Sequence, residues 1–345
     1  MRSRSPIVVA TLGGLAIGYP VALLIFIVSL RLVGERWWGT TIALYLPRFP
    51  FALPLLPLIV AIVWIGPRRL LWTQLVACVL LLFLTGFRVA WPTPPTAGAV
   101  RLRIVSCNIN AGALSVKRIM KPLLARSPDI IVLQEVNADS YAALRKLVPG
   151  YTVRELGQFW LASRFPVTST YGPRAEINGL PSMPFVQYRL DTPAGPVTLF
   201  NVHPLSPRDG LQSVRGDGLR HQFLRGELFN TRAREVVAQN TSFRLAELRA
   251  YAQSAHQESG PVIIAGDTNL PELSWAFARW LGDFSDGFAQ AGSGFGYSYP
   301  SPRDPWMRID RIMADGRYVR FRSFEVINQY ISDHYAVTSE LELVP

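Results

Sequence analysis

Four apolar runs in the C-terminal two thirds of the chain end in side chains that could do chemistry. They are Leu102–Cys107, followed by Asn108 and Asn110; Ile130–Leu133, followed by Gln134 and Glu135; Val197–Val202, which contains Asn201, followed by His203; and Val262–Gly266, followed by Asp267 and Asn269. In α/β sheets the carboxyl ends of strands form the edge where ligands bind. The pattern therefore predicts one polar site assembled from four strand ends.

Two later segments add to this set: Arg308, Asp310 and Arg311 in an apolar stretch, and Ser332-Asp333-His334 before the last apolar run. The whole set holds carboxylates, amides and two imidazoles, with no Cys and no Ser paired with a base. Oxygen ligands suit a hard cation such as Mg²⁺ or Mn²⁺, and imidazole suits acid/base chemistry. Each of these residues alone could equally belong to a turn, a helix cap or a structural histidine. Their occurrence together, in this order along the chain, favours a catalytic site.

The elements that position these residues fit one large α/β domain over residues 100–345. Further strand-like runs are Phe185–Leu190, Ile309–Met313 and Ala336–Leu341. Helical stretches are Asn137–Val148, which stops at Pro149-Gly150, and Thr231–Gln257. These lengths and their stop signals are typical of a mixed α/β fold.

The first 100 residues differ in charge from the rest of the chain. They hold eight Arg and one acid, Glu35, and so carry +7 of the net charge of +11. Residues 101–345 hold 27 basic and 23 acidic side chains. A chain that is 49% apolar is not disordered, and two Cys cannot form a disulfide framework. The concentration of charge in the first segment also weakens an interpretation as a nucleic-acid-binding protein.

Three uncharged runs predict three transmembrane helices within residues 1–91. They are Ile7–Leu30, of 24 residues, and Phe49–Gly66 and Leu70–Phe87, of 18 each. A cleavable signal peptide would explain only the first run, and buried helices of a soluble domain would need polar faces. Residues 92–99, rich in Pro and Thr, form a stiff linker. The arginine count leaves the orientation open, because four arginines flank the spans on each side.

The segments resemble the endonuclease/exonuclease/phosphatase superfamily, which includes DNase I-like nucleases, neutral sphingomyelinases and inositol polyphosphate 5-phosphatases. The matching segments are 103–110, 128–136, 161–167, 200–203, 261–269, 308–312 and 332–334. They cover nearly all of residues 101–345 in the family's order. The resemblance implies a DNase I-like four-layer α/β sandwich, in which helices flank two packed mixed β-sheets.

The resemblance also implies a metal site and a metal-dependent phosphoric ester hydrolase. Glu135, helped by Asn108, would hold Mg²⁺ or Mn²⁺, and Asp333 would contribute to the ligand shell or to a second metal position. Asn110 stands where some members carry an acid, so the sequence leaves open whether one or two metals bind.

Catalytic roles follow from the same resemblance. Asp267 would orient or deprotonate the attacking water, and Asn269 would steady the phosphate. His334, paired with Asp310, would donate to a phosphoryl oxygen as negative charge develops. His203 would be the second imidazole, as in the nuclease and sphingomyelinase branches.

The remaining site residues are less defined. Asn110, Asn201 and Arg164 are expected to bind substrate. The carboxylate partner of His203 is not evident from the sequence, and Glu155 and Glu176 are candidates by position alone.

The substrate is predicted from the setting of the site. The three spans look like those of bacterial membrane-anchored members, which favours a cytoplasmic N-terminus and an extracytoplasmic catalytic domain. Residues 208–230 mix Arg with apolar side chains, as in either a solvated loop or a segment lying on anionic membrane. A phosphorylated lipid or lipid-linked substrate is the leading prediction, a nuclease acting on DNA or RNA the second, and an inactive membrane-anchored binding module the third. No obligate protein partner is inferred.

Overall fold

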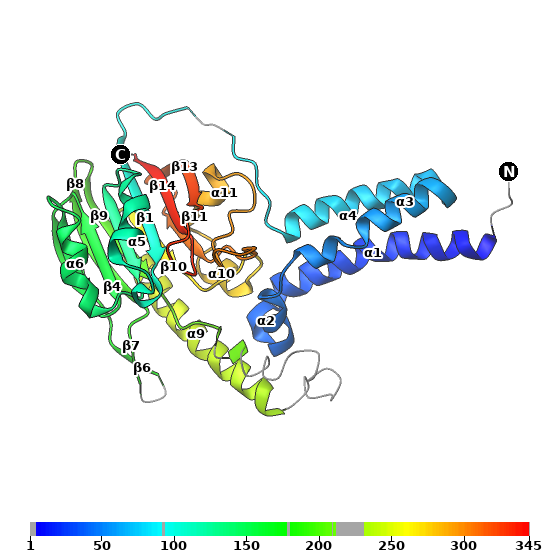
Figure 1. The fold of residues 1–345 in the computed structure, drawn as a ribbon, viewed down its shortest axis with the longest axis horizontal. Helices are drawn as coiled ribbons and strands as arrows, with labels where there is room; N and C mark the ends of the chain where they lie inside the picture. The colour runs from blue at the N-terminus through cyan, green and yellow to red at the C-terminus, as the bar shows by residue number, and fades with distance from the viewer. Residues whose placement is uncertain (1–4, 92–93, 178–179, 209, 212–230, 345) are drawn as a thin grey trace. The chain divides into compact units, whose positions relative to one another are not determined.

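The structure, a computed structural model, describes residues 5–91, 94–177, 180–208, 210–211 and 231–344 (Figure 1). Its contacts divide the chain into two units. The first comprises Met1–Phe87 with Leu273–Trp275, and the second comprises Arg88–Glu272 with Ala276–Pro345. We call them the helical unit and the catalytic unit.

The helical unit is built on one long helix. Its helices are α1 (Pro6–Leu32), α2 (Trp38–Leu44), α3 (Leu55–Ile65) and α4 (Leu71–Leu84), with 3₁₀ turns at Gly34–Arg36, Phe49–Ala52 and Arg68–Leu70. Leu12 and Ala16 of α1 are buried against Ile62 of α3. Gln74 of α4 is also buried and donates from Nε2 to the carbonyl oxygen of Ala16 (3.0 Å). Both shorter helices therefore pack on α1.

Among the described residues, one helix is long and apolar enough to cross a membrane. This is α1, whose 27 residues span roughly 40 Å at about 1.5 Å per residue. A second segment qualifies only if Trp38–Leu44 and Phe49–Ile65, bent by 86°, are counted together. Helix α3 has 11 residues, because it begins only after Pro54 within its apolar run. Helix α4 has 14 residues, since it follows the 3₁₀ turn Arg68–Leu70 and ends before Thr85 and Gly86, which has φ 74°. The structure shows one candidate span where three were predicted.

The catalytic unit contains two six-stranded mixed sheets and a small hairpin, β6 (Ala175–Ile177) with β7 (Leu180–Ser182). The first sheet has the order β13-β14-β1-β2-β4-β3. Its strands are β1 (Val100–Asn108), β2 (Ile130–Gln134), β3 (Thr152–Leu156), β4 (Phe159–Ser163), β13 (Val319–Ile327) and β14 (Ala336–Leu343). The second sheet has the order β11-β12-β10-β9-β8-β5. Its strands are β5 (Val167–Tyr171), β8 (Phe185–Thr192), β9 (Gly195–Val202), β10 (Val262–Asp267), β11 (Ser285–Asp286) and β12 (Asp310–Ala314).

Each sheet has one parallel pair at its centre, β1 with β2 and β9 with β10. The side chains that these four strands direct between the sheets change from apolar to polar along each strand. They are Leu102, Ile104, Ser106 and Asn108 on β1; Ile130, Val132 and Gln134 on β2; Val197, Leu199 and Asn201 on β9; and Ile263, Ala265 and Asp267 on β10. The apolar positions form the core between the sheets, and the polar ones gather at the carboxyl ends.

Gly266 allows β10 to approach β9 closely. Its φ is +146°, and a Cβ at this position would lie 2.1 Å from the carbonyl oxygen of Val202. Only glycine fits such a site. The Gly-Asp pair is therefore part of the strand that presents Asp267, whereas in isolation it would be typical of a turn.

Helices cover the outer faces of both sheets (Figure 1). On the first sheet, α5 (Val116–Leu124) and α6 (Tyr141–Lys146) cover the outward apolar side chains of β1 and β2. On the second sheet, Tyr251 of α9 (Thr231–Gln257) packs edge-on against Phe185 at 6.4 Å between ring centroids. The short helices α10 (Trp275–Trp280) and α11 (Gly287–Ala291) precede β12. This arrangement confirms the predicted DNase I-like sandwich.

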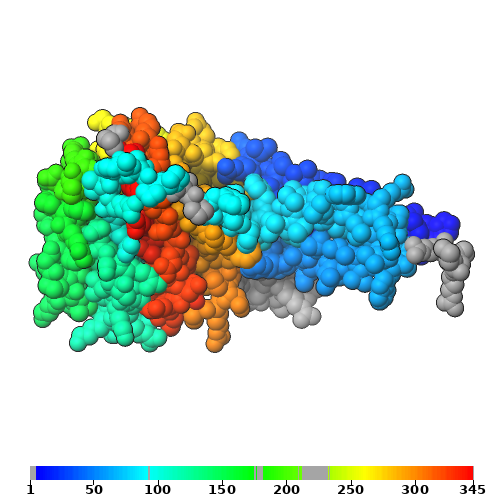
Figure 2. All heavy atoms as spheres, turned by 90° about the horizontal axis from the view of Figure 1, so that it is seen from above, coloured from blue at the N-terminus to red at the C-terminus, as the bar shows by residue number. Residues whose placement is uncertain are grey.

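The described part of the predicted linker, residues 94–99, lies on the catalytic unit. In Figure 2 its cyan atoms lie beside the red atoms of the C-terminal strand. Thr96 donates its backbone N–H to Glu342 (3.0 Å), and Arg322 donates to the carbonyl oxygen of Pro94 (2.9 Å). These bonds fix this stretch to the edge of the first sheet.

Four buried charges hold the loop that follows β10. Arg308 contacts Asp286 (2.8 Å) and Glu272 (2.5 Å), and Arg311 contacts the same two carboxylates at 2.5 and 3.2 Å. Arg311 also donates to the carbonyl oxygen of Leu270 (3.1 Å). Burial would raise the pKa of Asp286, but the two guanidinium groups lower it to about 2. They also lower the pKa of Glu272 against the effect of burial.

We expect Glu272→Ala to destabilise the protein by about 3–5 kcal/mol, because two buried guanidinium groups would share one carboxylate. The lowered carboxyl pKa values mean that the network stabilises the fold above the ordinary carboxyl range and loses this effect as pH falls toward about 2. Thermal unfolding of the detergent-solubilised chain between pH 7 and pH 3 measures both effects. The variant should therefore lose less stability on acidification than the parent chain.

Glu325→Ala is the matched control. Glu325 pairs with Arg126, and its side chain is 50% exposed. Exposed pairs contribute little, so this variant should unfold near the parent temperature. Equal stability of the Glu272 variant and this control would contradict the assigned role of the buried network.

Candidate active site

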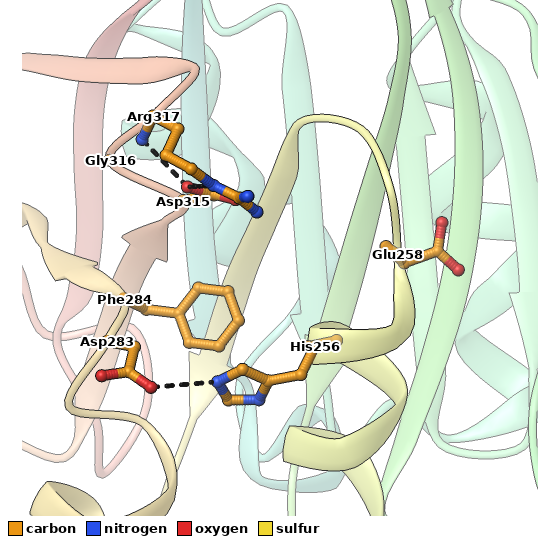
Figure 3. A pocket seen from close by; sticks show the side chains of 8 residues that line it. His256, Glu258, Asp283, Phe284, Asp315, Gly316 and Arg317 are labelled. Atoms are coloured by element: carbon orange, nitrogen blue, oxygen red, sulfur yellow. Dashed lines mark hydrogen bonds and ion pairs between the residues drawn. The ribbon is translucent and has the colours of Figure 1, made fainter.

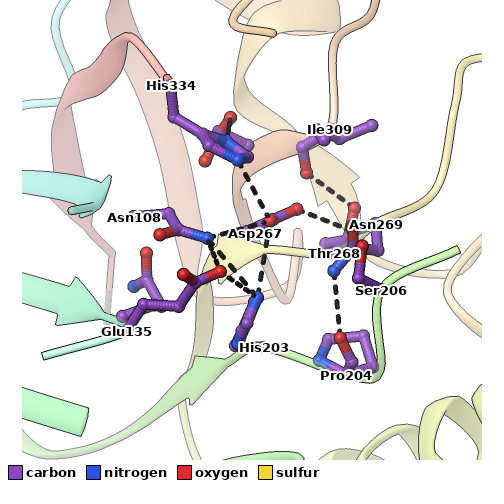
Figure 4. Close-up of polar contacts among 12 residues, drawn as sticks. Asn108, Glu135, His203, Pro204, Ser206, Asp267, Thr268, Asn269, Ile309 and His334 are labelled. Atoms are coloured by element: carbon purple, nitrogen blue, oxygen red, sulfur yellow. Dashed lines mark hydrogen bonds and ion pairs between the residues drawn. The ribbon is translucent and has the colours of Figure 1, made fainter. Parts of the chain in front are cut away.

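The carboxyl ends of the two parallel strand pairs meet in one cluster (Figure 4). Asn108 ends β1, Glu135 follows β2, His203 follows β9 and Asp267 ends β10. Asn108 Nδ2 donates to Glu135 Oε1 (2.8 Å) and to Asp267 Oδ2 (3.3 Å). One amide thus brings together carboxylates from two different sheets.

Asn108 is itself held by the loop after β1. The backbone N–H of Asn110 donates to Asn108 Oδ1 (3.0 Å). Asn110 has φ 46° and Glu135 has φ 51°, in the left-handed region that is costly for residues other than glycine. Such backbone strain is found where the surrounding structure fixes a functional geometry. Asn110 therefore contributes its backbone to the site by orienting Asn108.

His203 lies between the two carboxylates. Its Nε2 is 3.2 Å from Glu135 Oε1 and 3.7 Å from Asp267 Oδ2. Its Nδ1 is 2.8 Å from the side-chain oxygen of Gln158, in the turn between β3 and β4. The oxygen accepts a hydrogen bond from Nδ1–H, so Nε2 is the nitrogen that faces the site.

Sequence reasoning missed Gln158 and named two carboxylates instead. Glu155 forms an ion pair with Arg145 (3.1 Å), and Glu176 lies in β6. Among the described residues, His203 contacts Gln158, Glu135 and Asp267, but neither Glu155 nor Glu176. A glutamine in a turn carries no motif, so no pattern in the sequence could have selected it.

His334 and Asp310 form the second imidazole pair. His334 Nδ1 is 2.9 Å from Asp310 Oδ2, and Nε2 is 3.7 Å from Asp267 Oδ2. Asp310 opens β12, which runs antiparallel to β10 with Asp310 directly opposite Asp267. All three side chains are buried. The structure thus places the His–Asp pair as the sequence predicts, facing Asp267 from the side opposite His203.

Asn269 joins the loops that follow β9 and β10. Its backbone N–H donates to Asp267 Oδ1 (2.8 Å), and its Nδ2 donates to the carbonyl oxygen of Pro204 (2.9 Å). Arg244 of α9 donates to the carbonyl oxygen of Asn269 (3.1 Å). Asn269 therefore fixes the orientation of Asp267 and the path of the chain beyond His203.

Three predicted site residues do not join this cluster. Asp333 binds Arg208 through Oδ2 (3.0 Å) and makes no hydrogen bond to Glu135. Asn201 is fully buried between the sheets, where its Oδ1 accepts from Gln134 (2.6 Å). A side chain without solvent contact cannot bind substrate directly. Asn201 instead stabilises the strand ends through its hydrogen bond with Gln134.

Arg164 lies at the other end of the first sheet. It follows Ser163, which pairs with Ile130, the first residue of β2, whereas Glu135 follows the last. The separation along β2 is roughly 16 Å at about 3.3 Å per residue. The contacts of Arg164 are the hydroxyl of Tyr151 (3.0 Å) and Asp129 (4.0 Å). The structure does not bring Arg164 to the site.

The carboxylates of the cluster raise the pKa of both imidazoles. Burial by itself lowers the pKa of His334, but Asp310 and Asp267 outweigh it and raise this pKa to about 10. Burial also opposes protonation of His203, yet its hydrogen bond to Glu135 and the charge of Asp267 raise its pKa above the ordinary value. The surroundings of Asp267 therefore favour the protonated form of each imidazole.

The two carboxylates that share Asn108 differ in acidity. Burial raises the pKa of Glu135, but hydrogen bonds from His203 and Asn108 and both imidazole charges overcome it and lower the pKa to about 2. Burial raises the pKa of Asp267 in spite of the nearby His334. Glu135 is thus a permanent anion, and Asp267 is a stronger base than an ordinary aspartate.

The donor set fits a hard divalent cation such as Mg²⁺ or Mn²⁺. The side chain of Glu135 is 34% exposed, so its charge can be reached from solvent. A carboxylate oxygen of Asp267 and one of Asp310 lie within 4.8 Å of each other. Asp310 Oδ1 is buried and has no hydrogen-bond partner within the described part of the chain. Such an oxygen is costly unless something binds it.

A hollow elsewhere in the catalytic unit has different chemistry (Figure 3). Its volume is about 350 Å³, and its lining includes His256, Asp283 and Asp315. His256 Nε2 is 3.5 Å from Asp283 Oδ2, and Asp315 is engaged by Arg317. The backbone N–H of Asp315 bonds Val262, at the amino end of β10, so this hollow belongs to the sheet edge away from the catalytic cluster.

The fold and the cluster together define a class, the phosphoric ester hydrolases that work with a divalent metal ion. The model of the endonuclease/exonuclease/phosphatase family matches residues 105–334, and the chain belongs to this family. A comparison with curated proteins finds no match.

Solved structures show the same fold. A functionally unknown conserved protein from Enterococcus faecalis has 13% identity, with 70% of this chain and 100% of that one covered and a TM-score of 0.53. An endonuclease/exonuclease/phosphatase from Bacteroides vulgatus has 15% identity, with 71% and 100% covered and a TM-score of 0.52. The 3′ phosphatase NExo from Neisseria, bound to a product DNA hairpin, has 17% identity, with 69% and 98% covered and a TM-score of 0.50.

We expect Asp267→Ala and His334→Ala each to lower hydrolysis of a phosphate ester by at least about 10²-fold, the usual scale for losing an acid/base group or an oxyanion contact. Initial rates on bis-p-nitrophenyl phosphate with Mg²⁺ measure the loss. Near-normal turnover by either variant, at parental thermal stability, would remove that residue from the catalytic set.

Proposed function

We propose that this chain is a membrane-anchored, divalent-metal-dependent phosphohydrolase that cleaves a phosphodiester or phosphate ester on a lipid or lipid-linked substrate. The observation that carries the hydrolytic part is the cluster at the carboxyl ends of four strands, in which Asn108 joins Glu135 to Asp267 and two imidazoles face Asp267. The part concerning the lipid rests on the apolar surface of the helical unit.

In this proposal each side chain has one task. Glu135, oriented by Asn108, would hold the cation, which neutralises the non-bridging oxygens of the phosphate when it is bound. Asp267, whose pKa is raised, accepts a proton from the attacking water and aligns it for in-line attack. His334 keeps its proton because Asp310 holds Nδ1, and it donates from Nε2 to a phosphoryl oxygen as negative charge develops.

His203 would act on the other side of the phosphate. Its Nε2 lies between Glu135 and Asp267, and Gln158 keeps the ring from turning. A cationic imidazole there can donate to a second phosphoryl oxygen. The two imidazoles thus supply positive charge from both sides of Asp267.

The helical unit supports membrane anchoring. Many of its large apolar side chains are exposed, including Leu56 at 69%, Trp64 at 75% and Trp72 at 73%. Soluble monomers rarely expose contiguous apolar patches of this kind, whereas lipid chains would cover them at no cost. Helix α1 supplies one span, and a multi-pass anchor with an extracytoplasmic catalytic unit remains part of the proposal.

Nucleic acid is the second candidate substrate. The Neisseria neighbour was solved with a DNA hairpin, but residues 101–345 of this chain carry a net charge of only +4. Proteins that bind DNA through several phosphate contacts need a basic face. Lipid phosphates therefore rank first.

A substrate panel tests this ranking. The detergent-solubilised chain is given lipid phosphates, bis-p-nitrophenyl phosphate and DNA, each with Mg²⁺ or with EDTA. We expect Mg²⁺-dependent hydrolysis that EDTA abolishes, with a lipid phosphate cleaved fastest. Faster cleavage of DNA than of every lipid would reverse the ranking, and absence of EDTA-sensitive hydrolysis on all of them would favour a binding module.

The side of the membrane is tested by labelling. Tyr171 of β5 is 56% exposed in the catalytic unit, so Tyr171→Cys places a reactive thiol on its surface. In intact cells this variant should react with a membrane-impermeant maleimide more than the parent chain does. Labelling only after the cells are lysed would place the catalytic unit in the cytoplasm.

A further inference from the structure

Arg208 adjoins the catalytic cluster and has no role in the mechanism above. Its Nη2 donates to Asp333 Oδ2 (3.0 Å) and to the hydroxyl of Tyr299 (3.2 Å). The ring of Tyr299 lies 4.7 Å from the ring of His334, measured between centroids. The guanidinium group is therefore one side chain away from the imidazole that faces Asp267.

The backbone that carries Arg208 is fixed from several sides. Asn269 Nδ2 donates to Pro204 O (2.9 Å), Leu205 N donates to Glu247 Oε2 (2.5 Å), Asn240 Nδ2 donates to Ser206 O (3.1 Å), and Arg208 N donates to Ser206 Oγ (3.2 Å). Three successive residues are thus tied to α9 or to the loop after β10. Arg208 follows His203 on a short, anchored path, which suits a residue that must be in place before a ligand arrives.

The chemistry of Arg208 is that of an anion-binding group. Its side chain is 50% exposed, so its ion pair with Asp333 contributes little to stability. Nη2 makes both side-chain contacts, and Nε and Nη1 have no hydrogen-bond partner in the part of the chain that the structure describes. With Nη2 held by Asp333 and Tyr299, the N–H groups of Nε and Nη1 remain as charged donors that can bind phosphate oxygens.

We infer that Arg208 binds a second phosphate group of the substrate, next to the phosphoryl group that reacts. The inference rests on the proposed hydrolysis at the cluster of Asp267 and His334. Tyr299 stands between His334 and Arg208, so an anion held by Arg208 is a neighbour of the scissile group. The shared chemistry is a doubly phosphorylated substrate, which is a lipid diphosphate in the leading proposal and a 5′-phosphorylated oligonucleotide in the alternative.

The chain contains a matched control for this residue. Arg164 also binds a tyrosine hydroxyl, that of Tyr151, and approaches an aspartate, Asp129, with its side chain 53% exposed. It lies at the opposite end of the first sheet, away from the catalytic cluster. Arg164→Ala therefore removes the same kind of surface interaction without touching the site.

The kinetic experiment compares Arg208→Ala, Arg208→Lys and Arg164→Ala with the parent chain, all full-length in detergent. The substrates are farnesyl phosphate and farnesyl diphosphate, and a thymidine dinucleotide with and without a 5′ phosphate. Arg208→Ala should raise KM for the doubly phosphorylated member of the preferred pair by roughly tenfold or more, as expected for losing a charge-assisted hydrogen bond. Its kcat, and its KM for the singly phosphorylated member, should stay near the parent values.

The KM of Arg208→Lys for the doubly phosphorylated substrate should fall between those of the parent chain and the alanine variant, because lysine keeps the charge but loses the planar set of N–H donors. Arg164→Ala should leave all constants unchanged. The pair that shows the KM effect identifies the source of the second phosphate. An equal rise of KM for singly and doubly phosphorylated substrates, or a fall in kcat alone, would overturn the inference.

A binding measurement separates this inference from the proposed reaction. Calorimetric titration in EDTA with inorganic pyrophosphate and inorganic phosphate needs no turnover. The parent chain should bind pyrophosphate more tightly, and Arg208→Ala should lose that preference. If no substrate is hydrolysed but the preference is present and depends on Arg208, the anion site stands and the proposed function fails. If hydrolysis occurs and neither kinetics nor binding depends on Arg208, the inference fails alone.

Discussion

The register of two parallel strand pairs is the constraint on which the site depends. Along β1, β2, β9 and β10 every second side chain points between the sheets, and these positions change from leucine and isoleucine to asparagine, glutamine and aspartate. Because side chains alternate between the two faces of a strand, a slip of one residue in β1 would turn Asn108 to the outer face, and the same slip in β10 would turn Asp267. The same pairing that builds the core therefore sets the positions of the reacting groups. Gly266 strengthens this coupling, since it lets β10 lie against Val202 closely enough to fix the last residue of the strand.

Burial makes this geometry rigid, because each polar group must find a partner inside the protein. Gln134 reaches across to Asn201, and one layer further on Asn108 reaches Glu135 and Asp267. The Asp267 carboxylate lies between two imidazoles, and its negative charge stabilises their protonated forms. A site of this kind is already arranged for a developing charge before the substrate binds, which is the condition for strong electrostatic catalysis.

Much of the fold and of the site could be predicted from the sequence. A buried strand appears as a short apolar run, and a polar residue directly after it indicates a functional or structural role. All seven strand-like runs are strands, and the His334–Asp310 pair lies where the motif places it. What could not be predicted involves direction or contact between distant segments. Val319–Ile327 alternates charged and apolar residues, and the sequence did not identify it as a strand. Arg164 follows β4, which runs antiparallel to β2, so it lies at the opposite end of the sheet from Glu135. Gln158 contacts His203 from a turn that carries no motif. Hydropathy does not show where a helix begins or ends within an apolar run, so the later runs predicted longer helices than α3, which begins after Pro54, and α4, which ends at Leu84.

Net charge is a poor guide to what such a site binds. Around the cluster, Glu135, Asp267, Asp310 and Asp333 face His203, His334 and Arg208, so four potential negative charges stand against three positive ones. A divalent cation held by Glu135 would offset the carboxylate charge next to the reacting phosphate, so metal binding would strengthen substrate binding as well as support the chemistry. Most of the excess charge of the chain lies in its first 100 residues instead. Attraction to phosphate therefore depends on a few charged groups near Asp267. The basic composition of the chain comes instead from its N-terminal segment, where arginines lie at the ends of the apolar runs.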